Sequence, residues 1–414
     1  MSESHSHEAE NASRRARGDR GGDPPLCGPC GLCVRIAFVL AAVAAGCGKT
    51  PEREGMGRVL WHVEAGGIAY ADATRVVLWK DQELRCMSGI RGSIAWSADT
   101  GGVRPEHAAG ELLLFRPGEN QESLVAIWMR DGSKRWTFAS KDFLKLLTAG
   151  DRVFTSDRKG VLQAHSPVDG SPLWKTEGPA LVAEMAVDGA RAYGADANGT
   201  LLAWTLDGGR EVWRTPVDRQ VVDPLLVVGS RLLVSSGTLA RELRAYDSAT
   251  GREAWRWRGT AAPVSMWVQA GGIVYYSVGA NVHAVNADTG ERLWQTPATT
   301  APIVGAGQVH VGTLDGLRTL DWKTGKTLWE SPAMARALWS DADVVIAAND
   351  RKLAALDPTT GRPRWFFETS SEARWAMRAG PLLFVEAYDR PVRAPGAVDQ
   401  PKPVRHEVFC LRIE

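Results

Sequence analysis

Three cysteines near the N-terminus are the first residues whose spacing could support chemistry. Cys27, Cys30 and Cys33 have the Cys-x-x-Cys-x-x-Cys spacing found at the start of one type of iron–sulfur ligand run. The fourth cysteine, expected four residues later, is missing from the sequence, and His5 and His7 do not complete a ligand set. Because a metal site needs all of its ligands, we predict no metal centre in this segment.

Catalytic signatures are also missing from the sequence. It contains no G-x-S-x-G nucleophile elbow, no H-E-x-x-H zinc motif and no P-loop. Asp247, Asp321 and Asp357 recur at one position of a repeated pattern, where Thr and Gly follow them, so they are expected to cap turns. We therefore predict that the protein is not an enzyme and binds no cofactor.

Composition narrows the class of protein but does not assign a function. The 49 Lys and Arg residues nearly balance the 48 Asp and Glu residues, so the net charge is +1 and no basic excess points to nucleic acid. A content of 44% hydrophobic and 23% charged residues is typical of a folded soluble protein. The 17 Trp residues outnumber both Tyr and Phe, and this excess needs a structural explanation.

The first 46 residues differ from the rest of the chain. Residues 1–33 are mostly polar, with several arginines in their first half, and are expected to be a disordered extension. Translation starting near Leu32 or Val34 would remove this extension, and we keep that as a hypothesis. Residues 34–46 contain an uncharged run that is too short to cross a bilayer but has the length of a signal-peptide apolar region.

The apolar run ends in Ala44-Ala45-Gly46-Cys47, which resembles the lipobox of bacterial lipoproteins, although that family usually has Leu in place of Ala44. The resemblance implies cleavage before Cys47, acylation of Cys47 and a tether over residues 47–56. It also favours the outer membrane over the inner one, because Gly48 is not the Asp that retains lipoproteins in the inner membrane of enteric bacteria. The alternative is an ordinary cleaved signal with an incidental cysteine.

A thirteen-residue pattern explains many of the tryptophans. Its clearest copy is Leu243–Trp255, with a small residue at position three, Asp at position five, Gly at position nine and Trp at position thirteen. The tryptophans of the nine copies are Trp61, Trp96, Trp136, Trp174, Trp213, Trp255, Trp294, Trp329 and Trp365. The turn glycines are Gly57, Gly92, Gly132, Gly170, Gly209, Gly251, Gly290, Gly325 and Gly361.

Each pattern predicts a β-hairpin, and two more apolar stretches precede it, so one repeat contains four short strands. Four strands in roughly 38 residues are typical of a β-propeller blade, because so small a sheet needs neighbours to cover its faces. Residues 57–61 hold only the second half of a copy, and Val408–Ile413 hold only a first half. We therefore predict an all-β fold, a single propeller over residues 57–414, whose last blade combines strands from both termini.

The pattern resembles the repeat of the quinoprotein-type (PQQ-like) β-propeller family across residues 57–414. The propeller lipoproteins that carry this repeat usually have eight blades, whereas eight complete copies and one split copy predict nine blades here. Combined with the lipobox, the likeness extends to the propeller lipoproteins of the outer-membrane β-barrel assembly machinery. It implies a non-catalytic, periplasm-facing scaffold that binds envelope proteins as a monomer within a larger complex, with membrane contact through its lipid anchor.

Two other functions remain open at this stage. One is a dehydrogenase that uses PQQ and Ca²⁺, but the adjacent Cys-Cys pair that many such enzymes carry is missing from the sequence. The other is an orphan propeller that acts as a scaffold or sensor outside barrel assembly.

The resemblance also implies that the nine repeat tryptophans pack between adjacent blades. Other aromatic residues, among them Trp128 and Trp322, lie off the repeat and are better candidates for recognition. Cys86 and Cys410 both occupy position three, where we expect two buried thiols, with a disulfide as the alternative. A proline-rich insertion between residues 389 and 407 is a possible partner loop, and its cations are Arg390, Arg393, Lys402 and Arg405.

Overall fold

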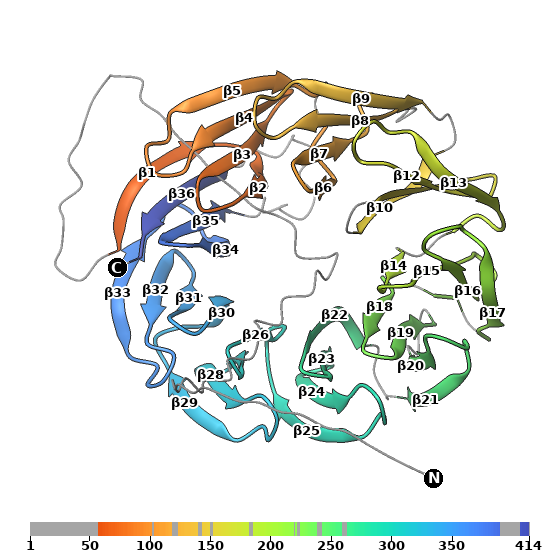
Figure 1. The fold of residues 1–414 in the computed structure, drawn as a ribbon. Coiled ribbons are helices and arrows are strands. Elements are labelled where there is room, and N and C mark those ends of the chain that lie inside the picture. Colours follow the sequence, from red (N-terminus) through yellow and green to blue (C-terminus); the bar gives the residue numbers. More distant parts are fainter. Residues whose placement is uncertain are drawn as a thin grey trace, which may run out of the picture.

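The computed structural model describes residues 57–101, 103–117, 123–139, 143–149, 152–181, 185–218, 220–221, 224–237, 242–258, 263–389 and 406–413. Within these ranges every regular element is a β-strand, and the strands form nine four-stranded antiparallel sheets. Figure 1 shows the sheets arranged as the blades of a ring, with the first strand of each blade innermost. The all-β propeller and its nine blades are therefore confirmed.

The blades are numbered in chain order, and their strands run from the centre of the ring to its rim. Blade 1 consists of β2 (Gly67–Ala71), β3 (Arg75–Lys80), β4 (Glu83–Ser88) and β5 (Ile94–Asp99). Blade 2 consists of β6 (His107–Ala109), β7 (Leu112–Phe115), β8 (Ser123–Trp128) and β9 (Lys134–Ala139). Blade 3 consists of β10 (Phe143–Ala149), β11 (Arg152–Asp157), β12 (Val161–His165) and β13 (Pro172–Glu177). Blade 4 consists of β14 (Ala186–Val187), β15 (Arg191–Ala195), β16 (Thr200–Thr205) and β17 (Glu211–Pro216). Blade 5 consists of β18 (Leu226–Val228), β19 (Arg231–Ser236), β20 (Glu242–Asp247) and β21 (Glu253–Arg258). Blade 6 consists of β22 (Pro263–Ala270), β23 (Ile273–Val278), β24 (Asn281–Asn286) and β25 (Arg292–Pro297). Blades 7 and 8 are β26 (Ile303–Gly305), β27 (Gln308–Thr313), β28 (Gly316–Asp321), β29 (Thr327–Ser331); and β30 (Arg336–Ser340), β31 (Val345–Asn349), β32 (Lys352–Leu356), β33 (Pro363–Glu368).

Blade 9 closes the ring with strands from both ends of the described chain. It consists of β34 (Ala373–Ala379), β35 (Leu382–Tyr388), β36 (His406–Arg412) and, as its outermost strand, β1 (Arg58–Glu64). The pairing of β1 with β36 places Trp61 opposite Cys410, which are positions thirteen and three of the split copy. The predicted closure by both termini is therefore confirmed.

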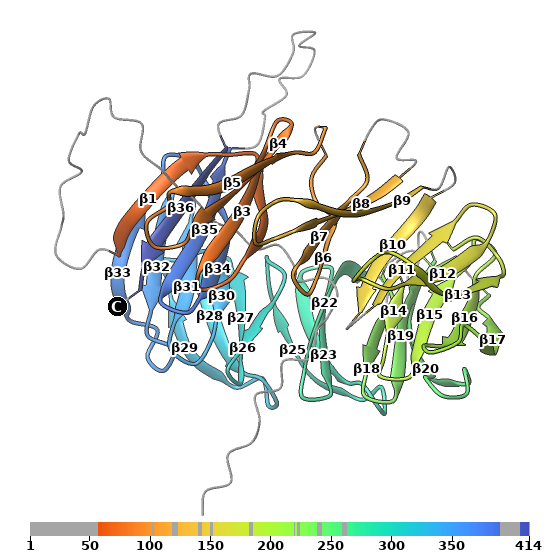
Figure 2. The same cartoon turned by 45° about the horizontal axis from the view of Figure 1, so that its top comes forward.

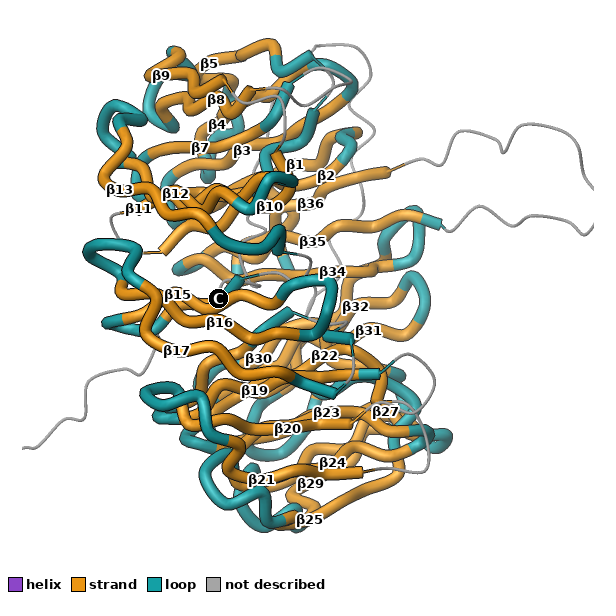
Figure 3. The backbone as a smooth tube through the Cα atoms, turned by 90° about the vertical axis from the view of Figure 1, so that its right-hand side faces the viewer, coloured by secondary structure: helices purple, strands orange, loops and turns teal. Residues whose placement is uncertain are grey.

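The hairpin between the third and fourth strands has the same geometry in blades 1 to 8. At the hairpin of blade 5, the Gly251 amide donates to the Asp247 carbonyl at 2.8 Å, and the Asp247 amide donates to the Arg252 carbonyl at 2.8 Å. Gly251 has a φ of +69°, a conformation that glycine adopts without steric cost. These eight turns and Gly57 lie on one face of the ring, here called the turn face, and Figures 2 and 3 show the ring tilted and from its side.

The hydrophobic core is divided among the gaps between neighbouring sheets. One cluster combines Tyr275 and Trp294 of blade 6 with Val309, Val311 and Leu320 of blade 7. Position three lies directly opposite the repeat tryptophan in every blade, as Ala284 does opposite Trp294. A small side chain at this position leaves room for the indole beside it.

Candidate functional site

Each repeat tryptophan of blades 1 to 7, and Trp61 of blade 9, reaches from its own blade to the turn of the next one. The indole Nε1 of Trp96 donates to the Met129 carbonyl at 3.0 Å, and a Cβ built on Gly132 would lie only 2.5 Å from the indole. The other donor and acceptor pairs are Trp61 and Gly89, Trp136 and Pro167, Trp174 and Leu206, Trp213 and Ser248, Trp255 and Ala287, Trp294 and Trp322, and Trp329 and Pro358. Trp365 of blade 8 packs against Gly57.

The carboxylates at position five are occupied by their own turns. Asp247 Oδ1 accepts the amides of Ala249 and Thr250, at 3.1 and 2.9 Å, and the Thr250 hydroxyl at 2.8 Å. The hydroxyl contact is the main reason why the pKa of Asp247 lies below its usual range. Hydrogen bonds from Arg364 first, and then from Thr360, lower the pKa of Asp357 to about 2. Such carboxylates are ionised turn caps and are poorly suited to act as general bases.

Three blades add a second donor to the turn carbonyl, which the repeat pattern alone does not predict. Tyr193 donates to the Ser248 carbonyl at 3.2 Å, and Tyr275 donates to the Trp322 carbonyl at 2.8 Å. In blade 7 the Gln308 amide donates to the Pro358 carbonyl at 2.8 Å. Tyr193 and Tyr275 lie opposite position three of their blades, so aligning the second strands of the repeats would have revealed them as polar residues at core positions.

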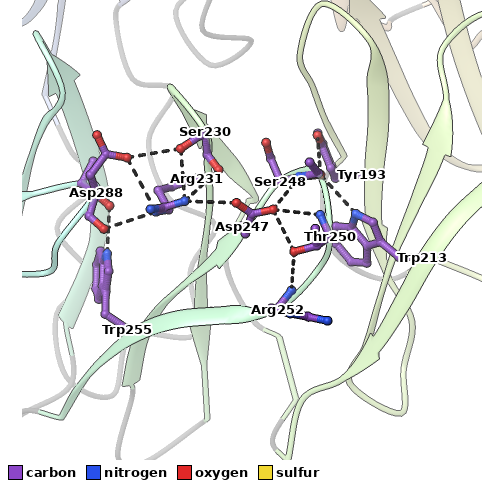
Figure 4. Close-up of polar contacts among 12 residues, drawn as sticks. Tyr193, Trp213, Ser230, Arg231, Asp247, Ser248, Thr250, Arg252, Trp255 and Asp288 are labelled. Atoms are coloured by element: carbon purple, nitrogen blue, oxygen red, sulfur yellow. Dashed lines mark hydrogen bonds and ion pairs between the residues drawn. The ribbon is translucent and has the colours of Figure 1, made fainter.

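Arg231 connects the turns of blades 5 and 6 (Figure 4). Its guanidinium lies 3.3 Å from Asp247 in its own blade and 3.6 Å from Asp288 in the next blade. Ser230 donates to Asp288 at 3.3 Å, so two residues of one loop bind the same neighbouring turn. The polar groups of this part of the turn face therefore hold blades together.

An ion cluster surrounds the buried Arg244 side chain of blade 5. Arg244 is 1% exposed and forms ion pairs with Asp218, with Glu242 at 2.7 Å and with Glu253 at 3.6 Å. Arg256 joins the cluster through Glu253 at 2.7 Å. Burying a guanidinium is unfavourable unless it is paired, and three carboxylates supply that pairing here.

Cys86 and Cys410 are buried free thiols. Cys410 packs with Trp61 and Met87 between blades 9 and 1, whereas Cys86 packs with Leu113 between blades 1 and 2. The sheet of blade 1 therefore separates the two sulfur atoms. Burial raises the pKa of both thiols, to about 11 for Cys86, which disfavours the reactive thiolate.

The remaining predicted site residues fall partly outside the described ranges. Cys47 and the four loop cations Arg390, Arg393, Lys402 and Arg405 lie outside them. The ends of the loop are described, and they meet where the rings of Tyr388 and His406 lie 4.6 Å apart. Of the off-repeat tryptophans, Trp204 is buried, and Trp322 is wedged against Gly271 with Lys323 over its ring at 4.9 Å.

The PQQ-dependent alternative requires a calcium donor set. Within the described ranges no three His, Cys, Asp or Glu side chains gather in a way that could hold a metal ion. A hollow between β1 and blade 1 is lined by apolar and charged side chains, among them Val63, Met87, Glu64 and Arg85. The described part of the chain also contains no helix long and apolar enough to cross a membrane.

The ring of four-stranded blades and the turn-bound tryptophans place the chain among the β-propellers built from PQQ-like repeats. A family model described as "Outer membrane protein assembly factor BamB" matches residues 158–309 and 242–400, which together make up more than half of the chain. The chain therefore belongs to the BamB family.

Individual relatives agree with this family. The chain is 27% identical to BamB of Burkholderia pseudomallei over 246 residues, covering 53% of this chain and 64% of that relative. It is 24% identical to BamB of Yersinia pestis over 292 residues, covering 66% of this chain and 68% of the relative. The match to the Burkholderia protein thus spans slightly less than two thirds of that relative.

Solved structures show the same fold. The crystal structure of BamB from Moraxella catarrhalis aligns with a TM-score of 0.50 at 17% identity, covering 86% of this chain and all of that one. The computationally designed protein Ika8 aligns with a TM-score of 0.51 at 14% identity, covering 74% of this chain and 95% of that one.

Proposed function

We propose that this protein is a non-catalytic envelope lipoprotein whose propeller serves as a protein-binding scaffold in outer-membrane protein assembly. The observation that carries the proposal is membership of a family whose model and relatives are named outer membrane protein assembly factors. Fold alone would not support a function, because propellers of this kind serve many purposes.

The use of polar residues in the described blades supports a scaffold. The carboxylates of Asp247 and Asp357 cap turns, and Arg231 ties two blades together. These groups stabilise a rigid ring instead of converging on a pocket where a substrate could react. A rigid ring holds its surface loops in fixed positions, which lowers the entropic cost of binding a protein partner.

Attachment through Cys47 is the second part of the proposal. Acyl chains on this residue, followed by a ten-residue connection to Gly57, would hold the ring at the periplasmic surface of the outer membrane. Mass spectrometry of the mature N-terminal peptide tests it directly. We expect a triacylated Cys47 in the wild-type protein and a soluble, unmodified chain for Cys47→Ala, whereas an unmodified Cys47 in the membrane fraction would contradict the anchor.

We further propose that the loop between Tyr388 and His406 contributes to partner binding. Its cations Arg390, Arg393, Lys402 and Arg405 provide charge, and its prolines limit the conformations that binding must freeze. Replacing all four cations by Ala should reduce partner recovery without lowering the melting temperature. Unchanged recovery would assign the loop no role.

Affinity purification from detergent-solubilised envelope tests the scaffold itself. We expect the tagged protein to recover the core of the barrel-assembly machinery, and recovery of other envelope proteins only would favour an orphan scaffold. As a separate check, PQQ, Ca²⁺ and a dye acceptor should give no oxidation of alcohols or sugars. Turnover of such a substrate would overturn the non-catalytic proposal.

A further inference from the structure

Exposed aliphatic side chains that do not recur in the repeat lie mainly on blades 9, 1 and 3. Nine large hydrophobic side chains are exposed among the described residues, and four of them recur at position twelve of their repeats: Leu173, Val212, Leu293 and Leu328. Of the other five, Val59, Ile90, Ile94 and Val168 lie on the turn face or at the adjoining ends of outer strands in blades 9, 1 and 3. Only Leu314 among these five lies elsewhere, on the opposite face.

Ile90 and Val168 occupy the tips of their turns, at position seven. They are 59% and 61% exposed, whereas the described turns of blades 4 and 6 carry Asp207 and Asp288 at the same position. Side chains at turn tips are not required for the ring to close, so Ile90 and Val168 are available to contact another surface.

Blade 2 lies between these two turns and presents an aromatic and cationic surface. Trp128 occupies position five, where blades 5, 7 and 8 have Asp, and the guanidinium groups of Arg130 and Arg135 lie 4.7 and 5.5 Å from its ring centroid. Arg135 also donates to the Val168 carbonyl at 2.7 Å, which connects blade 2 to the exposed turn of blade 3. Ile90, Trp128, Arg130, Arg135 and Val168 are called the turn edge below.

Nearby charges leave the turn edge mildly basic. Arg91 and Lys134 are exposed beside it and add two more cations. The two neighbouring carboxylates, Asp131 and Asp169, each accept an amide and a hydroxyl hydrogen bond from the serine two residues later, and Asp131 also pairs with Arg130 at 3.3 Å. A surface that combines aliphatic, indole and arginine side chains has the composition of a membrane-interface contact.

The position of the tether favours the bilayer as the surface that the turn edge contacts. Gly57 lies on the turn face at blade 9, and Trp61 four residues later donates to the Gly89 carbonyl at 3.1 Å, directly beside Ile90. Gly57 is ten positions after Cys47, so an acylated Cys47 keeps this point within about 35 Å of the bilayer. In Figure 1 the outer strands β1, β5, β9 and β13 follow one another along this arc of the rim.

We propose that the turn edge rests on a bilayer surface containing anionic phospholipids, so that the propeller stands with its turn face towards the membrane. This inference rests on the lipid anchor of the proposed function and adds a second contact to it. A second contact matters because an acyl anchor alone leaves the ring free to rotate, whereas an anchor and a surface patch together fix its orientation.

Vesicle flotation of the unlipidated Cys47→Ala chain, processed to remove residues 1–46, tests the surface independently of both the acyl anchor and the apolar signal segment. We expect flotation with vesicles of phosphatidylethanolamine and phosphatidylglycerol, and at least tenfold weaker binding to phosphatidylcholine vesicles. Adding Ile90→Glu and Val168→Glu should weaken binding to the anionic vesicles at least tenfold. The matched control is Leu314→Glu, which places the same charge on a side chain that is 94% exposed on the opposite face and should leave binding unchanged.

Three outcomes would overturn the proposal. The first is absence of vesicle binding, and the second is equal binding by the Ile90→Glu, Val168→Glu protein with an unchanged melting temperature. The third is loss of the barrel-assembly partners by this variant in detergent, where no bilayer is present, because the turn edge would then be a protein-binding surface. If the variant loses vesicle binding but keeps its partners, the turn edge binds the membrane and a different surface binds the partners.

Discussion

Tyr193 and Trp213 of blade 4 donate hydrogen bonds to the same acceptor, the carbonyl oxygen of Ser248 in blade 5, at 3.2 and 3.1 Å. The two side chains come from different strands, and their rings lie 6.0 Å apart. One carbonyl of the neighbouring turn therefore anchors two strands of blade 4.

The shared carbonyl predicts unequal effects of removing its two donors. Tyr193→Phe removes the hydroxyl contacts to both the Ser248 carbonyl and the Asp188 carboxylate, and should lower the free energy of unfolding by about 2 kcal/mol. Trp213→Ala also removes the packing of the indole against Gly251 and should lower it by about 3–5 kcal/mol. Urea unfolding followed by circular dichroism measures both, and similar losses for the two variants would contradict this assignment.

Glycine at position nine should be required chiefly because the indole of the preceding blade lies against it. A Cβ on Gly251 would approach Trp213 to 2.5 Å, whereas Gly229, which also has a positive φ, has nothing within 4 Å of its Cβ position. Gly229→Ala should cost about 1–2 kcal/mol of backbone strain, and Gly251→Ala should cost clearly more. Equal melting temperatures for the two variants would show that the indole moves aside without penalty.

Stability should fall in mild acid because of buried histidines. His310 lies between the hydroxyls of Thr319 and Ser340, at 2.7 and 2.8 Å, and burial lowers its pKa to about 3. The unfolded chain, with an ordinary histidine pKa near 6.5, binds a proton that the folded chain excludes. Stability is therefore complete above about pH 6.5 and falls as the pH drops towards 3, by about 2 kcal/mol at pH 5.

Burial also lowers the pKa of His165 and His283, which adds losses of the same sign. Urea unfolding of wild type and His310→Gln at pH 7.5 and pH 5 isolates the contribution of His310. The variant should lose less stability than wild type between the two pH values, and an identical loss would rule out His310 as a source.

Loss of Arg244 from the ion cluster of blade 5 should lower the free energy of unfolding substantially. Arg244→Ala leaves Glu242, which is 4% exposed, without its closest cation, and should cost about 3–5 kcal/mol. Arg214 forms a similar pair with Glu211 on the exposed outer strand of blade 4, so Arg214→Ala serves as the control and should leave the urea midpoint unchanged. A midpoint shift of the same size in both variants would show that burial is not the cause.

The two ring cysteines should be inert in the folded protein. Cys86 and Cys410 are buried, and their raised pKa values keep them as thiols at pH 8. In the Cys47→Ala chain, processed to remove residues 1–46, a thiol reagent should react only in denaturant and with both groups. Rapid labelling of the native protein would place one of the thiols at the surface.

The fold was predictable from the sequence because its main contacts repeat within a short pattern. Gly132 must be glycine and Ala126 must be small because an indole lies against each of them, so both constraints recur in every copy. The nine-blade count follows from the same periodicity. The split copy likewise predicted closure, since Trp61 lacked a partner strand until Val408–Ile413 supplied it.

The contacts that the sequence did not predict join residues with no fixed spacing. Tyr193 meets Ser248 over 55 residues, and Arg231 meets Asp288 over 57. These contacts occur in some blades and not in others, so periodicity gives no signal for them. Of the turn edge, the sequence indicated only Trp128, as an off-repeat aromatic residue suited to recognition, whereas Ile90 and Val168 gave no signal because they depart from the repeat.

Blade 9 sets the order in which the ring can be completed. β1 forms its hydrogen bonds with the last strand, β36, so more than 300 residues separate Trp61 from Cys410, the residue opposite it. Contacts this distant in sequence form slowly. Loss of β36 would remove the strand that pairs with both β1 and β35 in blade 9. Because β1 pairs with β36, the ring closes only after the last strand of blade 9 has been made and has docked beside the first.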